Sequence, residues 1–486
     1  MDNELYKRVS DWFDDHREAM VRDIERLVRI PSVSEPSEEQ PPFGQACRDC
    51  MDEMLAMGRE HGFSTENYDY YAGSIGGETK DWDNMIGLWN HLDVVPAGNG
   101  WSQDPFEPVR KKQFLIGRGA DDNKGPAVGM LYVMKCIREL GIPMEHELRL
   151  FVGCDEERGM EDLAWYARQG YPYPKLSMIA DSGFPVCYGE KGIVEGWMYA
   201  EKPFSEEVLE CEGGSASNMI PDLAWVKLRC SGALERELAE KTAGEQACAE
   251  GISWEIKENS LCIRAKGTSR HSAFPEGSRN AVHELAAFLA GLESLTAQDR
   301  EIFRALAQLS EGYDGAPVGI CYSDEVSGST TCAATVLRTR DRHAGLQFNI
   351  RYAITADKNA LLESLKKSAE RCGLVWEPVR VSEPNYFPKE HPAVKILTDL
   401  FNEVTGEARE SFTMGGGTYA RKLPNAFAYG VGGMKDDAAD REASKELFAP
   451  GHGGAHGPDE ALNVRKLTDA LKIYVMALHA LNGCSL

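Results

Sequence analysis

Five short segments place His, Asp or Glu side chains directly after an apolar run or inside a glycine-rich turn. They are residues 90–93 (NHLD), 117–126 (GRGADDNKGP), 154–159 (CDEERG), 180–183 (ADSG) and 450–460 (PGHGGAHGPDE). Ligands of α/β proteins bind outside the carboxyl ends of the strands, so polar side chains there are better site candidates than side chains in the middle of a helix. Imidazoles and carboxylates in such places indicate metal binding and general acid–base chemistry.

The first of these segments follows an expected strand, residues 85–91. Residues two apart in a strand face the same way, so the Asp93 carboxylate can accept a hydrogen bond from the His91 imidazole. The other ring nitrogen of His91 is then left for a metal ion. A single His-x-Asp pattern is more often structural than functional, so it depends on support from the other segments.

The remaining segments supply that support. Asp121 and Asp122 are adjacent among glycines, and such carboxylates repel each other unless a cation is near. Glu156 and Glu157 allow one carboxylate to bind a metal ion while its neighbour acts as a general base for water. Each pattern alone is also typical of a solvated turn. Together the segments supply two imidazoles and three carboxylates, which suits two divalent ions that share a bridging carboxylate.

The order of these motifs resembles that of a known family. HxD, GRGxxDxKG, a Glu pair, an Asp and a C-terminal His follow one another in this way in the di-zinc aminoacyl peptidases. That family includes carnosinases, succinyl-diaminopimelate desuccinylase, glutamate carboxypeptidase and aminoacylase-1, and the resemblance is strongest to the bacterial Xaa-His dipeptidase type. It runs from an expected N-terminal helix, which includes residues 20–28, to the last expected helix and so covers nearly the whole chain.

The resemblance implies a ligand set of five residues. One zinc ion would be bound by His91 and Asp181, the other by Glu157 and His456, with Asp122 bridging the two. The implied cofactors are therefore two Zn²⁺ per chain. Mn²⁺ or Co²⁺ stays an alternative, because nitrogen and oxygen ligands alone do not select among these ions.

Further roles follow from the same resemblance. Asp93 would orient His91, and Glu156 would take a proton from water and later pass it to the leaving amine. The DxKG alignment selects Asp122 over Asp121 as the bridging residue. Asn123 stands where these dipeptidases often have Asp, a change that we expect to be harmless because it lies outside the ligand set.

The middle of the chain carries matches of its own. Residues 267–273 (GTSRHSA) resemble the family's lid-domain motif, in which His271 would help to hold the tetrahedral oxyanion. Arg351 would grip the terminal carboxylate of the substrate, a task suited to a planar bidentate donor. The other implied substrate-binding residues are Asn218, Gly416, Gly417 and Thr418.

The elements that must position these residues alternate between strand and helix. Residues 85–91, 148–153, 176–180 and 426–430 are expected strands, and residues 126–140, 280–292, 358–368, 393–404 and 460–481 are expected helices. This pattern predicts an α/β fold with a mixed, largely parallel sheet covered by helices on both faces. We expect a di-metal catalytic domain in two pieces, residues 1–190 and 391–486, interrupted by an inserted α+β lid domain, residues 191–390.

The amino-acid composition limits the kinds of molecule that the protein is expected to bind. The 53 Lys and Arg residues against 77 Asp and Glu residues give a net charge of −24, spread along the chain. The electrostatic field of this negative charge disfavours binding to nucleic acid and to anionic membranes. The acidic N-terminus lacks the pattern of a secretory signal, and the 13 Cys residues lie mostly in apolar strings, so we expect a cytoplasmic protein. We expect a monomer, with a homodimer as the alternative.

The sequence therefore predicts a metal-dependent dipeptidase that cleaves dipeptides with free termini, including Xaa-His or β-Ala dipeptides. Two alternatives stay open, an N-acyl-amino-acid amidohydrolase or desuccinylase of the same family and a non-catalytic metal-binding protein. A thiol redox role for Cys47 and Cys50 is disfavoured, because their spacing fits the buried face of a helix. His452, four residues before His456, is interpreted as a residue that helps to shape the cleft.

Overall fold

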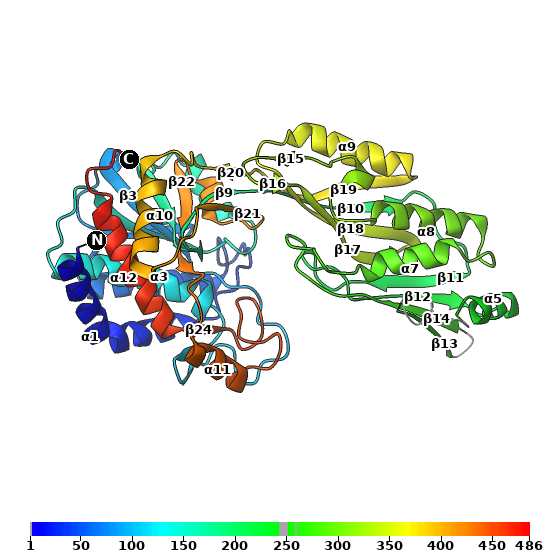
Figure 1. The fold of residues 1–486 in the computed structure, drawn as a ribbon, viewed down its shortest axis with the longest axis horizontal. Coiled ribbons are helices and arrows are strands. Elements are labelled where there is room, and N and C mark those ends of the chain that lie inside the picture. The colour runs from blue at the N-terminus through cyan, green and yellow to red at the C-terminus, as the bar shows by residue number, and fades with distance from the viewer. Residues whose placement is uncertain (1, 243–250, 258–259) are drawn as a thin grey trace. The chain divides into compact units, whose positions relative to one another are not determined.

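The structure, a computed structural model, describes residues 2–242, 251–257 and 260–486 (Figure 1). The chain divides into two compact units. Unit 1 comprises Met1–Gly189, Asn385–Thr413 and Gly417–Leu486, and unit 2 comprises Glu190–Pro384 and Met414–Gly416. The short segment Met414–Gly416 thus belongs to unit 2 although it lies beyond the range expected for the inserted domain.

Unit 1 is built on a mixed sheet. Its strands run in the order β1 (Ser64–Tyr68), β2 (Ala72–Gly76), β6 (Glu147–Gly153), β3 (Met85–His91), β7 (Leu176–Ile179), β22 (Ala426–Tyr429), β9 (Val186–Glu190) and β20 (Asn385–Tyr386), with β21 (Phe412–Met414) beside β9. The central strands β6, β3, β7 and β22 are parallel, whereas β2 and β9 pair antiparallel at the two sides. Every residue of β3 is buried, as expected for a strand covered on both faces.

Helices cover both faces of this sheet. Ala72 clusters with Tyr166 of α4 (Glu161–Arg168), whereas the next residue, Gly73, faces Met51 of α2 (Gln45–Glu60). Successive residues of a strand point to opposite faces, so α2 and α4 lie on opposite sides of the sheet. A Cβ atom at Gly73 would lie 2.6 Å from the Met51 sulfur, so glycine is needed for α2 to approach this closely.

The other helices of unit 1 pack against one another. α1 (Asn3–Val28), α3 (Gly125–Glu139) and α12 (Val464–Ala480) contact each other, and α10 (Pro392–Thr405) packs on α12 (Figure 1). The shorter elements are η1 (Trp82–Asn84), β4 (Val109–Lys111), β5 (Phe114–Ile116), η2 (Ala120–Lys124), β8 (Ser182–Gly183), η4 (Tyr419–Lys422), β23 (Val431–Gly432), α11 (Ala438–Leu447) and β24 (Ala461–Asn463).

Unit 2 is built on an antiparallel sheet. In the described residues its strands run in the order β13 (Ile252–Lys257), β14 (Ser260–Lys266), β12 (Leu223–Arg229), β11 (Val208–Gly213), β17 (Thr331–Arg340), β18 (His343–Tyr352), β10 (Gly192–Ala200) and β19 (Leu374–Ser382). The remaining elements are α5 (Gly232–Thr242), α7 (Ala281–Ala290), α8 (Ala297–Leu309), η3 (Ala316–Val318), β15 (Ser323–Asp324), β16 (Gly328–Ser329) and α9 (Lys358–Arg371). One apolar core joins sheet and helices through residues such as Met198, Leu285, Phe303 and Leu365.

The predicted fold class is confirmed, because unit 1 is a mixed α/β unit with a parallel centre. Strand 85–91 has the predicted bounds as β3, and Cys47 and Cys50 lie buried within α2. The predicted helix over 460–481 is wrong at its start. Ala461–Asn463 instead pairs with β5, and the Asn463 side chain accepts a hydrogen bond from the Lys466 amide, so the helix begins at Val464.

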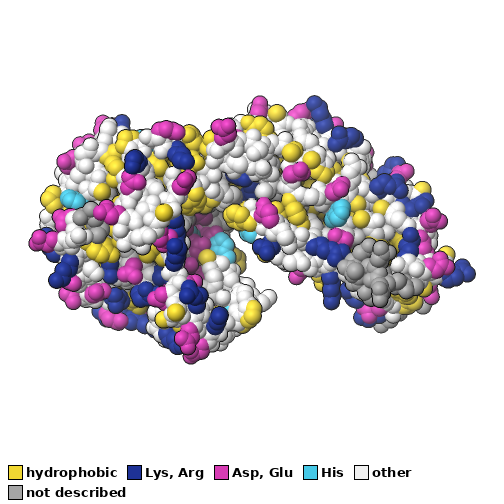
Figure 2. All heavy atoms as spheres, viewed as in Figure 1, with side chains coloured by type: hydrophobic (Ala, Val, Ile, Leu, Met, Phe, Trp, Pro, Cys, Tyr) yellow, Lys and Arg dark blue, Asp and Glu magenta, His cyan; other side chains and the backbone are white. Residues whose placement is uncertain are grey.

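The surface carries both charges. On the face shown in Figure 2, acidic and basic side chains are interspersed, with smaller hydrophobic areas between them. None of the helices in the part of the chain that the structure describes combines the length and the apolar character needed to cross a bilayer.

Candidate metal centre

Three adjacent parallel strands bring ligand-type side chains to one edge of the unit 1 sheet. β3 ends at His91, β6 is followed by Glu156 and Glu157, and β7 is followed by Asp181. Because β3 lies between β6 and β7, with His91 level with Gly153, the three carboxyl ends meet. This is the position at which α/β sheets bind ligands.

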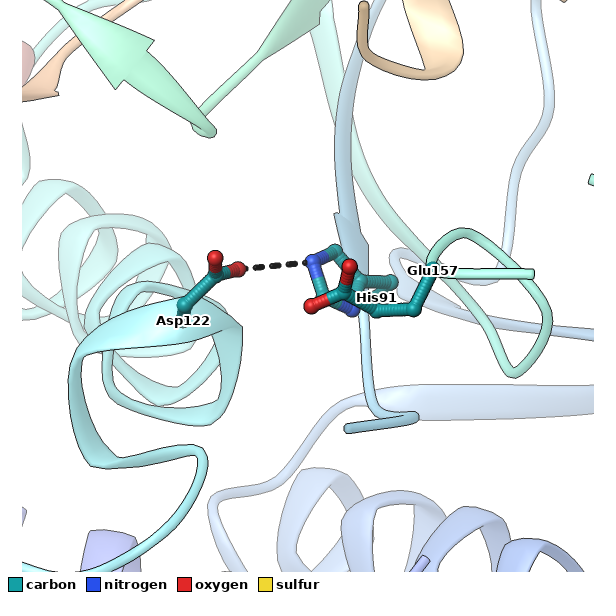
Figure 3. A group of neighbouring side chains, drawn as sticks. All are labelled: His91, Asp122 and Glu157. Carbon is teal, nitrogen blue, oxygen red and sulfur yellow. Dashed lines mark hydrogen bonds and ion pairs between the residues drawn. The ribbon is translucent and has the colours of Figure 1, made fainter. Parts of the chain in front are cut away.

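Asp122 contacts two histidines from opposite ends of the sequence. Its Oδ1 atom lies 3.0 Å from His91 Nε2, and its Oδ2 atom lies 3.0 Å from His456 Nε2. His456 Nε2 also lies 2.8 Å from Glu157 Oε1. Figure 3 shows the Asp122 carboxylate pointing toward the His91 ring, with the Glu157 carboxylate overlapping the ring in this view. A carboxylate with one oxygen toward each imidazole has the geometry of a bridging ligand.

Two overlapping groups of side chains are compact enough to hold a metal ion. The ligand atoms of His91, Asp122 and Glu157 lie within 4.8 Å of one another, and so do those of His91, Glu156 and Asp181. His91 Nε2 is 3.7 Å from Asp181 Oδ2. The candidate ligand atoms are nitrogen and oxygen, a set that fits divalent ions such as zinc or manganese.

The protonation of each residue in this cluster depends on the charges of its neighbours. Burial opposes a charge on His91, but hydrogen bonds to Asp122 and Asp93 raise the pKa of its imidazole well above the usual value. Hydrogen bonds to Asp122 and Glu157 raise the pKa of His456 to about 11. Burial favours a neutral Asp122, but the hydrogen bonds from both histidines hold its pKa below the usual range. Ligand imidazoles must be neutral, so a bound metal ion would displace these protons.

Asp93 connects His91 to the glutamate turn. His91 Nδ1 lies 3.0 Å from the backbone carbonyl of Asp93 and 3.4 Å from its carboxylate. That carboxylate accepts hydrogen bonds from the amides of Glu156 (3.2 Å) and Glu157 (3.0 Å). Asp93 therefore contacts the imidazole mainly through its backbone carbonyl and holds the glutamate turn through its carboxylate.

Glu156 differs from its neighbours in its surroundings. Only 8% of it is exposed. Desolvation raises the pKa of its carboxyl group well above the usual value, and nearby carboxylates add to this effect. A raised pKa is what a carboxyl group needs in order to exchange protons near neutral pH.

A buried ion pair that we did not predict holds the backbone at Asp122 in place. The Arg118 guanidinium donates to Glu460 over 2.6 Å, and both side chains are almost fully buried. Glu460 also accepts the amides of Asp121 (3.0 Å) and Asp122 (3.1 Å). The sequence held one indication of this ion pair, because Arg118 lies in the GRG turn and Glu460 lies four residues after His456.

Glu460→Gln is expected to destabilise unit 1 by about 3 kcal/mol, because removing one charge leaves the Arg118 guanidinium buried and uncompensated. Urea unfolding of the two proteins measures the difference. Glu161→Gln is the matched control, because its ion pair with Arg168 is more than half exposed. We expect the control to leave stability nearly unchanged, because an exposed ion pair contributes little. Equal effects would reject the supporting role of Glu460.

Asn123 has a contact that the sequence did not reveal. Its amide donates to Asp181 Oδ1 over 2.9 Å and to the carbonyl of Ala180 over 3.0 Å, and its own oxygen accepts from Asn90. Asn123 is thus outside the predicted ligand set but orients a member of it.

Asn123→Ala should weaken metal binding by about 10- to 100-fold, the range typical when a residue that orients a ligand is lost. Competition with a chromophoric chelator measures this affinity. Asn67→Ala, which removes an amide from an exposed turn, is the control. Unchanged affinity in Asn123→Ala would contradict the orienting role.

Three other candidates of unit 1 have local contacts. His452 Nδ1 lies 2.8 Å from Asp459 Oδ2, and Asp459 accepts from Ser102, so His452 joins the loop that carries His456 to its neighbours. Thr418 is buried and accepts the Ala420 amide over 3.1 Å at the start of η4. The adjacent Gly417 packs against the Arg421 guanidinium.

Unit 2 brings its own candidates together. The Ser272 amide donates to the Asn218 carbonyl over 2.8 Å, and the Ser272 hydroxyl donates to Asn349 over 2.9 Å. Arg351 donates to the same Asn349 oxygen and to the Gly415 carbonyl. Asn218, His271, Arg351 and Gly416 therefore belong to one hydrogen-bonded neighbourhood of unit 2, through the residues beside them in sequence.

Imidazoles and carboxylates gathered at the carboxyl edge of this mixed α/β sheet fit a metal-dependent hydrolase. The sequence profile of the Peptidase family M20/M25/M40 matches residues 87–480, and the chain belongs to this family. The family resemblance predicted from the motifs is confirmed. The protein is a hydrolase that acts on peptide bonds, and its family implies divalent metal ions.

Similar proteins span the whole chain. "Putative dipeptidase YtjP" of Bacillus subtilis (strain 168) is 28% identical over 479 residues, covering 96% of this chain and 97% of its own. A "Putative dipeptidase" of Staphylococcus epidermidis is 28% identical over 485 residues, covering 96% and 98%.

Solved structures share the fold. Human carnosine dipeptidase 1 has a TM-score of 0.58 at 14% identity, with 98% of this chain and 100% of that chain covered. The dipeptidase Dug1p of Saccharomyces cerevisiae has a TM-score of 0.59 at 14% identity, with 99% of each chain covered. At this identity the likeness concerns the fold.

Proposed function

We propose that the protein is a metal-dependent dipeptidase that uses two zinc ions to hydrolyse dipeptides with free termini. The observation that carries the proposal is the position of Asp122, one oxygen toward His91 and the other toward His456. With Glu157 and Asp181 this makes the five-residue ligand set of the family resemblance. Relatives named as dipeptidases support the choice of substrate class.

The chemistry is divided between the metal ions and the chain. Bound divalent ions polarise the substrate carbonyl and make water more acidic. Glu156 takes a proton from the attacking water and then donates it to the leaving amine, a role for which its buried position and raised pKa suit it. Asp93 holds the turn that carries Glu156 in place.

Residues outside the ligand set would recognise the substrate. Arg351 is a planar bidentate donor that is only 7% exposed and held by Asn349, so its guanidinium is pre-oriented for a carboxylate. His271 would donate a hydrogen bond to the oxyanion, Asn218 would contact the substrate backbone, and Gly416, Gly417 and Thr418 would line the substrate cleft. These six assignments, that of Arg351 included, stay predictions.

An assay with chelated enzyme tests the proposal. Leu-Leu and β-Ala-His are offered beside their N-acetylated forms, each with and without added zinc or manganese. Metal-dependent cleavage of the free dipeptides alone is the expected result. Preference for the acetylated forms would assign the protein to the N-acyl amidohydrolases instead, and cleavage of neither would leave a metal-binding protein without this activity.

A further inference from the structure

A cavity of about 450 Å³ in unit 1 opens directly beside the metal-ligand residues. Its lining includes Asp122 and Asp181 and continues past them to Asp121, Asp436 and Lys466. A group bound through Asp122 and Asp181 therefore has room next to it for a further part of the same molecule.

Among the acids that line this cavity, Asp121 has no assigned task. Asp122 contacts His91 and His456, Asp181 accepts from Asn123, and Asp436 pairs with Lys466. In the part of the chain that the structure describes, no hydrogen bond or ion pair reaches the Asp121 carboxylate. Its backbone is nevertheless fixed, because its amide donates to Glu460 over 3.0 Å.

The position of Asp121 suits a positively charged group next to the scissile carbonyl. The α-nitrogen of a peptide lies two bonds, about 2.5 Å, from the carbonyl carbon of its own residue, and consecutive Cα atoms such as those of Asp121 and Asp122 are about 3.8 Å apart. An ammonium group this near to divalent ions is repelled by them, so its binding requires a carboxylate close by. The Lys466 ammonium group is bound by Asp436 and the Met434 carbonyl and makes no ion pair with Asp121.

We propose that Asp121 is a specificity-determining residue that binds the free amino group of the substrate's first residue. This inference rests on the proposed dipeptidase function and deepens it, because it explains why a free dipeptide is taken in preference to its N-acyl form. An acyl group removes the positive charge and leaves the Asp121 carboxylate unpaired.

Asp121→Asn tests the assignment with three probes, given to enzyme loaded with zinc. Leu-Leu carries the α-ammonium group, 4-methylpentanoyl-Leu lacks only that group, and Nα-acetyl-Lys-Leu carries a side-chain ammonium group instead. Where turnover is too slow, each compound is measured as a competitive inhibitor. We expect kcat/KM for Leu-Leu to fall about 10- to 100-fold, the range for a lost charge-assisted hydrogen bond, and the other two probes to change by less than about threefold.

Controls separate the possible failures. Asp399→Asn, the same substitution on the exposed surface of α10, should leave all three probes unchanged. Equal losses for Leu-Leu and 4-methylpentanoyl-Leu, or loss of bound zinc from Asp121→Asn, would overturn the inference. A penalty confined to Nα-acetyl-Lys-Leu would move the contact to a side-chain ammonium and overturn it as well. If the wild type cleaves no free dipeptide, the proposed function fails, whereas inhibition by Leu-Leu still reports on Asp121.

Discussion

Glu156→Gln is expected to lower kcat by about 10³-fold or more, at the upper end of what a positioned acid–base group contributes. The amide has nearly the shape of the carboxyl group but cannot take a proton from water. Glu156 is not in the proposed ligand set, so bound zinc should stay unchanged. Steady-state kinetics with Leu-Leu and metal analysis of the same samples measure both quantities.

The neighbouring glutamate is the matched control for this prediction. Glu157→Gln removes a carboxylate that touches His456. We expect the Glu157 variant to lose metal and activity together, whereas the Glu156 variant loses activity alone. A Glu156→Gln enzyme with more than about one tenth of wild-type kcat would show that this residue is not the general base.

Asp122→Ala is expected to abolish activity and to weaken both metal sites at once. The reason is geometric, because each carboxylate oxygen lies 3.0 Å from a different imidazole nitrogen. Removing it takes a ligand from both ions and leaves them to repel each other across the site. Zinc titration followed by calorimetry should show that affinity falls at both sites.

Asp121→Asn is the control for the bridge, because this residue is the adjacent acid in the same turn. It should retain its zinc. If Asp122→Ala kept one site at wild-type affinity, Asp122 would be a ligand of a single ion. If Asp121→Asn lost both ions, the alignment that selects Asp122 would be wrong.

The sequence predicted most of the elements that carry the site. A strand that is covered on both faces is apolar along its length, and this makes it easy to recognise in a sequence. The predicted strand 85–91 therefore has the bounds of β3. The helix over 460–481 was misplaced at its start, because Ala461–Asn463 is apolar enough for either element and pairs with β5 through a contact distant in sequence. Local periodicity does not report such pairing.

The supporting contacts were harder to predict than the ligand-type residues. His91, Asp122 and Glu157 lie in motifs that can be recognised by residue type and spacing. The partners of Asp122 and Asp181 lie far away in sequence or appear unremarkable, as Glu460 and Asn123 do. Their roles depend on which buried polar groups meet in the folded chain, and a hydrogen bond between distant residues leaves no mark in the local pattern.

We propose that hydrolysis of a free dipeptide depends on a pair of metal ions held by this cluster. The most direct test of this proposal is to remove metal with a chelator, add zinc back in measured equivalents and follow Leu-Leu cleavage at each step. We predict no cleavage without zinc and activity that rises until two equivalents per chain are bound. Full activity in the chelated protein, or saturation that leaves Leu-Leu uncleaved, would contradict the account.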